Sequence, residues 1–216
     1  VISPHDHTRL YAATRTGVYR SADAGESWER VLDPSVYGGC MDLAARPDLP
    51  GDALFVACGS FQQARVWRTL AAEGAEAWEP VLTESAMGRT SLAIAPSNPS
   101  VIYALAASNQ NDPRGGPSQA MLAVYRSTAG GEAGSWQSRV RNTSTDPVAP
   151  LLLSNPIVQL QSQCWPGSLN SYSTMGWYVN IIAVDPVDEN RVWAAGVDLF
   201  RSEDAGATWR PASYWW

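Results

Sequence analysis

The stretch Ser21-Ala22-Asp23-Ala24-Gly25-Glu26-Ser27-Trp28 returns later in the chain as Ser202-Glu203-Asp204-Ala205-Gly206-Ala207-Thr208-Trp209. Both copies match the pattern S-x-D-x-G-x-[ST]-W. Two looser copies keep the same frame with two extra residues, at Ser127 to Trp136 and at Thr69 to Trp78. Self-similarity of this kind is the sequence signature of a repeat architecture. The chain is therefore predicted to contain four copies of one structural unit.

The residues around each copy repeat as well. A triplet of an apolar residue, an aromatic residue and an arginine comes directly before each copy, at Val18-Tyr19-Arg20, Val66-Trp67-Arg68, Val124-Tyr125-Arg126 and Leu199-Phe200-Arg201. A short apolar run lies upstream of each triplet. Before that run a further one ends in a proline turn, as at Leu43 to Pro47, Leu92 to Pro96 and Ile181 to Pro186. With the strand that follows each Trp, this makes four short strands per unit, the plan of a propeller blade.

The pattern resembles that of Asp-box, or BNR-repeat, propellers, which include sialidases, xyloglucanase-like glycoside hydrolases, sortilin-type receptors and photosystem assembly factors. The resemblance implies an all-β fold, a β-propeller of four-stranded antiparallel blades with Asp-box turns. We expect about four blades, at 1–36 (partial), 37–84, 85–142 and 178–216, and a long inserted loop at 143–177. The first unit lacks an innermost strand. We therefore expect further blades of the same protein, in a ring of about six to eight.

The composition limits the possible partners. All 15 basic residues are arginine, and 21 acidic residues give a net charge of −6. An acidic chain without a basic stripe argues against nucleic acid as a partner. No run of about 18 apolar residues is present, so membrane insertion is not expected. His5 and His7 form no zinc pair and the cysteines form no C-x-x-C, so neither a metal site nor another cofactor is predicted.

The three cysteines leave the redox state open. Cys58 lies in an apolar alternating run and is predicted to be a buried thiol. A disulfide between Cys40 and Cys164 is the other possibility that the sequence allows. We expect the protein to be secreted or periplasmic.

The boxes and the arginines before them are interpreted as structural. A ligand site normally occurs once in a protein, whereas these motifs recur once in each blade. Ser and Asp side chains cap turns, and Gly accommodates a positive φ. By the same reasoning Arg20, Arg68, Arg126 and Arg201 are predicted to make ion pairs or stacking contacts, not a sialidase-like arginine triad.

The loops at the blade ends opposite the boxes are predicted to form the ligand face. The long segment from Arg141 to Tyr178 stands out, because ordered connections of that length are usually functional. Aromatic rings stack on sugars while amides bond their hydroxyl groups. On this basis the ligand-binding candidates are Gln62, Asn111, Trp165, Tyr172, Trp177 and Tyr178. The alternative is a small local core made of Leu151-Leu152-Leu153, Ile157, Val158 and Leu160 and covered by the aromatic residues.

Catalytic residues are harder to assign. Hydrolysis of a glycosidic bond needs two carboxyl groups about 5 to 10 Å apart. The candidates are Asp42, Asp112 and Asp146, with Asp42 first because it opens an innermost strand and can face a central channel. The sequence therefore favours a propeller module that binds a glycan or a protein on its loop face. The alternatives are part of a sialidase- or xyloglucanase-like glycoside hydrolase, and an assembly or scaffold protein.

Overall fold

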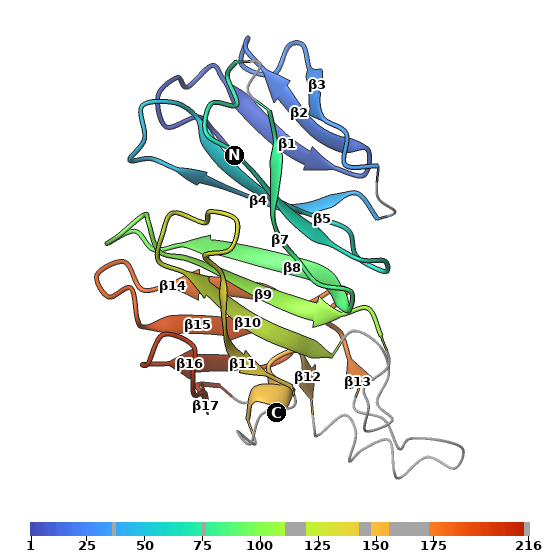
Figure 1. The fold of residues 1–216 in the computed structure, drawn as a ribbon, viewed down its shortest axis with the longest axis vertical. Helices are drawn as coiled ribbons and strands as arrows, with labels where there is room; N and C mark the ends of the chain where they lie inside the picture. Colours follow the sequence, from blue (N-terminus) through green and yellow to red (C-terminus); the bar gives the residue numbers. More distant parts are fainter. Residues whose placement is uncertain (36–37, 75–76, 111–119, 143–147, 156–172, 214–216) are drawn as a thin grey trace.

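The computed structural model describes residues 1–35, 38–74, 77–110, 120–142, 148–155 and 173–213. Within these ranges the fold is all-β, with four antiparallel sheets of three or four strands that follow one another along the chain. In Figure 1 the first two sheets lie above the last two, which overlap in this view. No helix in the described ranges is long and apolar enough to cross a membrane.

Each of the four sheets is a meander in which consecutive strands pair. The first two sheets contain β1 (Leu10–Thr14), β2 (Gly17–Ser21) and β3 (Glu29–Leu32), then β4 (Cys40–Arg46), β5 (Ala53–Cys58), β6 (Arg65–Thr69) and β7 (Glu79–Thr83). The last two contain β8 (Met87–Ile94), β9 (Ile102–Ser108), β10 (Met121–Ser127) and β11 (Gln137–Arg141), then β14 (Ile181–Val184), β15 (Val192–Ala195), β16 (Leu199–Ser202) and β17 (Arg210–Pro211). The first sheet has one strand fewer than the others, as the sequence predicts.

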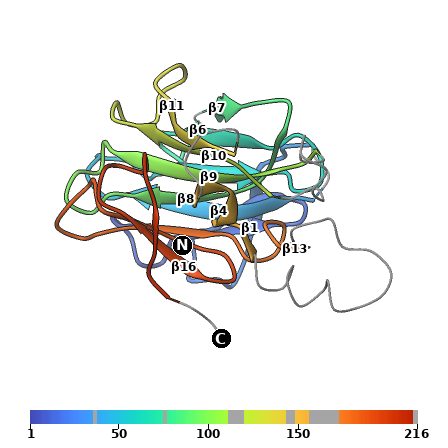
Figure 2. The ribbon, with the colours of Figure 1, turned by 90° about the horizontal axis from the view of Figure 1, so that it is seen from below.

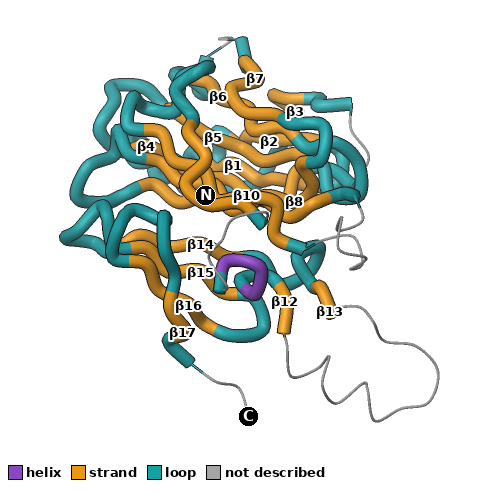
Figure 3. The backbone as a smooth tube through the Cα atoms, turned by 60° about the horizontal axis from the view of Figure 1, so that its bottom comes forward, coloured by secondary structure: helices purple, strands orange, loops and turns teal. Residues whose placement is uncertain are grey.

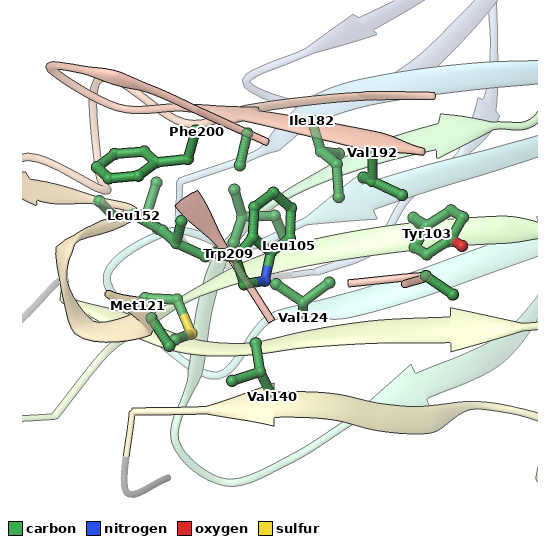
Figure 4. Packing of buried hydrophobic residues seen from close by; sticks show 14 of the residues in the cluster. Tyr103, Leu105, Met121, Val124, Val140, Leu152, Ile182, Val192, Phe200 and Trp209 are labelled. Carbon is green, nitrogen blue, oxygen red and sulfur yellow. The ribbon is translucent and has the colours of Figure 1, made fainter. Parts of the chain in front are cut away.

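The sheets pack face to face, so their second strands are the most deeply buried. All six residues of β5 are buried, as are the first six of β9. The core between the third and fourth sheets includes Leu105, Met121, Phe200 and Trp209 (Figure 4). The first strands of successive sheets also lie together, because β4 packs against β8 and β8 against β14. Seen from below, the sheets overlap as successive layers (Figure 2).

The boxes are hydrogen-bonded turns. Ser21 Oγ accepts a bond from the Gly25 N–H (2.8 Å) and donates one to Asp23 (2.7 Å). Asp23 also accepts bonds from the N–H (2.9 Å) and the hydroxyl (2.5 Å) of Ser27, while Trp28 Nε1 donates to the Gly25 carbonyl (3.1 Å). The box at Ser202 to Trp209 repeats every one of these bonds. Their structural interpretation is confirmed.

The four arginines that precede the boxes make ion pairs, as predicted. Arg20 pairs with Glu29, Arg68 with Glu79, Arg126 with Glu189 and Arg201 with Glu203. The pairs of Arg20 and Arg68 join neighbouring strands of one sheet. The pair of Arg201 lies at the end of β16, and that of Arg126 reaches from the third sheet to the fourth.

The expectation for the cysteines is wrong in one respect. Cys58 is not a free thiol, because it forms a disulfide with Cys40. The two residues are direct partners in the β4–β5 register, and both are buried. The pairing of Cys40 with Cys164 is thereby excluded, and Cys164 itself lies outside the described residues.

The described part of the inserted segment begins with residues that belong to the core and ends with two short paired strands. It contains a 3-10 turn, η1 (Ala149–Leu151), drawn in purple in Figure 3, and the paired β12 (Ser154–Asn155) and β13 (Ser173–Thr174). Leu152 and Leu153 are fully buried, and they join the core between the third and fourth sheets instead of a separate one. Ile157, Val158 and Leu160 lie outside the described residues.

Candidate functional site

A hollow of about 270 Å³ opens where the first strands of three sheets meet, and we call it the axial hollow. Its walls come from β4, β8 and β14 and consist of Met41, Asp42, Arg89, Ser91, Leu92, Asn180, Ile181 and Ile182. These strands reach the hollow because β8 packs between β4 and β14. Asp42 is the only carboxylate in this set.

Asp42 links the second sheet to the third. One carboxylate oxygen accepts a bond from its neighbour Leu43 N–H (2.9 Å), and the other accepts one from Leu92 N–H on β8 (2.7 Å). Burial raises the pKa of Asp42 above its usual range, against the opposing effect of these two bonds and of the nearby Arg89 cation. A raised pKa suits a general acid. However, both carboxylate oxygens are already engaged as acceptors, which favours a structural link.

Arg89 holds the segment that leads into β14. Its Nη1 donates to the backbone carbonyls of Trp177 (2.7 Å) and Tyr178 (3.0 Å). Burial lowers the pKa of Arg89, and the neighbouring Asp42 carboxylate opposes that shift. A guanidinium stays charged at neutral pH even so. Arg89 therefore places a cation at the hollow and fixes the position of two aromatic residues beside it.

Asn180 completes the polar wall. Its side-chain Nδ2 donates to the backbone carbonyls of Arg89 (3.1 Å) and Leu105 (3.3 Å). The backbone carbonyl of Asn180 accepts a bond from Ser91 Oγ (2.6 Å). Two buried polar atoms of this wall, Asn180 Oδ1 and Arg89 Nε, have no hydrogen-bond partner among the described residues. Buried polar groups are normally satisfied. One is an acceptor and the other a donor, so a hydroxyl group, which can do both, has suitable chemistry for this wall.

Three exposed aromatic residues gather beside the axial hollow, and we call them the aromatic platform. Trp177 lies between the others, with its ring centroid 6.1 Å from that of Phe61 and 5.5 Å from that of Tyr178. The exposed fractions are 53% for Phe61, 43% for Trp177 and 63% for Tyr178. Large apolar side chains gathered on a surface mark interaction sites more often than isolated ones do.

The platform brings together only some of the residues predicted from sequence. Trp177 and Tyr178 form it, Asp42 lines the adjoining hollow, and Gln62 is exposed next to Phe61. The predicted residues that lie outside the described ranges are Asn111, Asp112, Asp146, Trp165 and Tyr172.

Sequence reasoning missed Phe61, Arg89 and Asn180. Phe61 carried a usable signal, since it is an apolar residue within the polar turn Gly59-Ser60-Phe61-Gln62-Gln63. The position of Arg89 depends on how β8 packs between β4 and β14. No motif indicates that packing.

A second acid of the loop face, Glu84, is not free for catalysis. Arg141 binds it through both terminal nitrogens, at 2.5 and 3.1 Å. The bonds from Arg141 hold the pKa of Glu84 below its usual range although burial opposes this. The carboxylate therefore stays ionised and cannot serve as a general acid near neutral pH.

Solved structures of larger proteins share this arrangement of sheets. A GH74 enzyme from Niastella koreensis matches 97% of this chain with a TM-score of 0.64 at 14% identity. An ancestral GH74 enzyme matches 99% with a TM-score of 0.59 at 19% identity. The chain is a segment of a β-propeller.

The propeller segment spans only 28% and 23% of the lengths of those two enzymes. YCF48 from Cyanidioschyzon merolae gives a TM-score of 0.47 at 14% identity, over 94% of this chain and 55% of its own. No protein-family model and no curated protein sequence matches. Identities this low establish the fold alone.

Proposed function

We propose that this propeller segment binds a glycan on its loop face, at the aromatic platform and the adjoining axial hollow. The observation that carries the proposal is the exposed group of Phe61, Trp177 and Tyr178 beside a polar wall. Aromatic faces stack on the apolar faces of pyranose rings, and a few polar groups then fix the orientation. A protein ligand is the alternative occupant of the same face. We further propose that additional blades complete the ring.

The polar wall favours a hydroxylated ligand over an apolar one. Asn180 Oδ1 and Arg89 Nε are an unsatisfied acceptor and an unsatisfied donor. Both atoms are covered in the free protein, so a ligand contacts them only when a neighbouring side chain moves. A sugar hydroxyl could bond to either. The Arg89 cation would also tolerate a carboxylate-bearing sugar.

The test is binding to an array of plant and microbial oligosaccharides, followed by titration calorimetry on the strongest binder. Replacing Trp177 by Ala should weaken binding about tenfold, since aromatic anchors at interfaces contribute more than 1 kcal/mol. The thermal midpoint should stay unchanged, because the side chain is exposed. As a control, Val187→Ala removes apolar surface that is 81% exposed at the β14–β15 turn, and it should leave binding unaltered.

Two results would contradict the proposal. One is an array without any binder. The other is a Trp177→Ala variant that binds sugar normally but melts at a much lower temperature, which would assign the platform to the core. Binding of a protein from the same source, with no glycan binding, would favour the protein ligand.

Hydrolysis is the second candidate function, and one observation favours it. Burial raises the pKa of Asp42, which lines the axial hollow. A glycosidase needs a second carboxyl group about 5 to 10 Å away, and the described wall of the hollow has none. In this case the partner acid would come from another part of the ring. Failure of the full-length protein to release reducing sugar from the polysaccharides that it binds would eliminate this function.

A further inference from the structure

The first strands of the second and third sheets each contain a β-bulge near their beginning. On β4, the stretch from Cys40 to Asp42 faces one residue fewer on β5, which leaves Met41 as the extra residue. On β8, the stretch from Met87 to Thr90 likewise faces one residue fewer on β9. The β14–β15 pair has no such shift. Bulges redirect side chains and are frequent beside functional sites. Two of the strands that form the axial hollow are therefore irregular where they reach it.

The β8 bulge, from Met87 to Thr90, is held in place by side chains. The Thr90 hydroxyl donates to the Gly88 carbonyl (2.9 Å), and Asn180 Nδ2 donates to the Arg89 carbonyl (3.1 Å). Because a bulge locally disrupts the ladder of backbone hydrogen bonds, its polar groups need other partners. These two bonds supply partners for the carbonyls of both residues inside the bulge. The bulge is therefore a specified feature of the fold.

The β8 bulge contacts the turn that carries the phenylalanine of the aromatic platform. We call this turn, Gly59 to Gln63, the platform turn. The Met87 carbonyl accepts a bond from the N–H of Ala64, the residue that follows the turn (2.7 Å). A Cβ atom on Gly88 would lie only 2.8 Å from the Ser60 carbonyl oxygen. The bulge and the platform turn thus approach each other closely, and the absence of a side chain on Gly88 permits it.

Arg89 connects the same bulge to the other half of the platform. Its Nη1 donates to the backbone carbonyls of Trp177 and Tyr178, as described above. That segment is itself a compact turn, because the N–H groups of Tyr178 and Val179 both donate to the Met175 carbonyl (2.7 Å each). One bulge therefore contacts both backbone segments that carry the three aromatic rings.

The β4 bulge is bordered by the Cys40–Cys58 disulfide. Cys58 is the last residue of β5, so the platform turn begins directly after it. Beside the disulfide, the Gly59 N–H donates to the Gly39 carbonyl (2.7 Å). The covalent link therefore anchors the chain three residues before Phe61.

The position of the platform depends on these backbone anchors, because its three side chains are exposed. A site whose groups are ordered in advance loses less conformational entropy when a ligand binds. We propose that Arg89 and the Cys40–Cys58 disulfide are positioning residues, each of which holds one half of the aromatic platform in its ligand-binding arrangement. The ligand in this inference rests on the proposed function. The order of the platform is a property of the free protein and is tested separately.

The first test needs no ligand and measures amide hydrogen exchange of the free 216-residue chain by mass spectrometry. Arg89→Met keeps an apolar stem but loses both bonds to the segment before β14. Exchange at Tyr178 and Val179 should accelerate about tenfold or more, because bonds from a charged donor are strong. The control Arg30→Met makes the same chemical change at an exposed ion pair in the first sheet, and it should leave both rates unchanged.

The disulfide variant should affect the other half of the platform. In Cys40→Ala/Cys58→Ala, exchange at Gly59 should accelerate, whereas exchange at Tyr178 and Val179 should stay as in the wild type. Arg89→Met should show the reverse selectivity. Equal acceleration throughout the chain would mean that the variants only lower global stability, and wild-type rates in both segments would mean that neither group positions the platform. Either result overturns the proposal.

The second test measures the dissociation constant of the strongest binder from the oligosaccharide array. Arg89→Met should weaken binding about tenfold. Arg89→Lys should restore only part of the loss, because an ammonium lacks the planar fork of a guanidinium. Full restoration by Lys would show that charge alone matters and would overturn the positioning role of Arg89.

Gly88→Ala tests the contact between the β8 bulge and the platform turn. The added methyl group would displace the Ser60 backbone, so binding should weaken although no aromatic or polar side chain is lost. The control Gly74→Ala adds the same group where the nearest atom is 3.7 Å away, and it should bind as the wild type does. A ligand that binds Gly88→Ala, Arg89→Met and the disulfide variant normally would overturn the proposal. An array without any binder would refute the proposed function instead, and the exchange rates would still decide the positioning roles.

Discussion

Asp52 is a buried carboxylate at the boundary between the first two sheets. It accepts hydrogen bonds from the Ser3 hydroxyl (2.6 Å), the Tyr11 hydroxyl (2.7 Å) and Arg9 Nη1 (2.7 Å), and the residue is fully buried. Removal of one member of a buried ion pair is strongly destabilising. We predict that Asp52→Asn lowers the free energy of unfolding by about 3 kcal/mol, measured by urea denaturation. The control Asp33→Asn breaks an exposed ion pair with Arg30 and should change it by less than about 1 kcal/mol.

Asp52 also makes the stability of the folded protein depend on pH, and its stabilising contribution is lost in acid. Burial by itself would raise the pKa of Asp52, but the bonds from Ser3, Tyr11 and Arg9 outweigh it and hold the pKa below its usual range. A carboxyl whose folded pKa is depressed contributes stability above its unfolded pKa of about 3.9, and loses it as the pH falls through the folded value. The difference in stability between wild type and Asp52→Asn should therefore shrink below about pH 4. A difference that stays constant down to pH 2 would show that the carboxylate charge is not the cause.

At the scale of elements, the Cys40–Cys58 disulfide joins β4 to β5 beside the axial hollow. Disulfides persist in oxidising compartments, which supports a secreted or periplasmic location as a proposal. After expression into such a compartment and alkylation without reductant, the tryptic peptide from Val31 to Arg65, which holds both Cys40 and Cys58 because trypsin does not cleave the Arg46–Pro47 bond, should carry no alkylated cysteine. The double variant Cys40→Ala/Cys58→Ala should lose about 3 kcal/mol, the value expected for a closed loop of this size. Recovery of both thiols in alkylated form would contradict the disulfide.

The strands and turns also show how much of the structure could be predicted from the sequence. Strand order, the box turns and the roles of Arg20 and Arg68 follow from local repeats, because each depends on residues close together in the chain. The partner of Cys40 does not, since it depends on the β4–β5 register, which contains an irregularity between Cys40 and Asp42. The site residue Arg89 was missed for a related reason. Its role arises only where β8 meets the segment before β14, about 90 residues later in the chain.

At the scale of the molecule, the sheets form a nearly one-dimensional array in which each contacts its neighbours. Stability in such arrays is close to a sum of unit and boundary terms. In the isolated 216-residue segment the end sheets should therefore open before the middle ones. We predict that amide hydrogen exchange is slowest in β5 and β9, which are buried along almost their whole length, and fastest in β3 and β17 at the outer edges of the end sheets.

The Asp52→Asn variant makes this prediction sharper, because Asp52 bonds to Arg9 and Tyr11 across the first boundary. Loss of these contacts weakens one boundary and leaves the other two intact. Exchange in β1 and β2 should accelerate while that in β9 and β10 stays as in the wild type, measured by mass spectrometry on peptides from each strand. Equal acceleration in every sheet would mean that the segment unfolds as one cooperative unit. In that case the boundaries would be too strong for the ends to open separately, and the array description would fail.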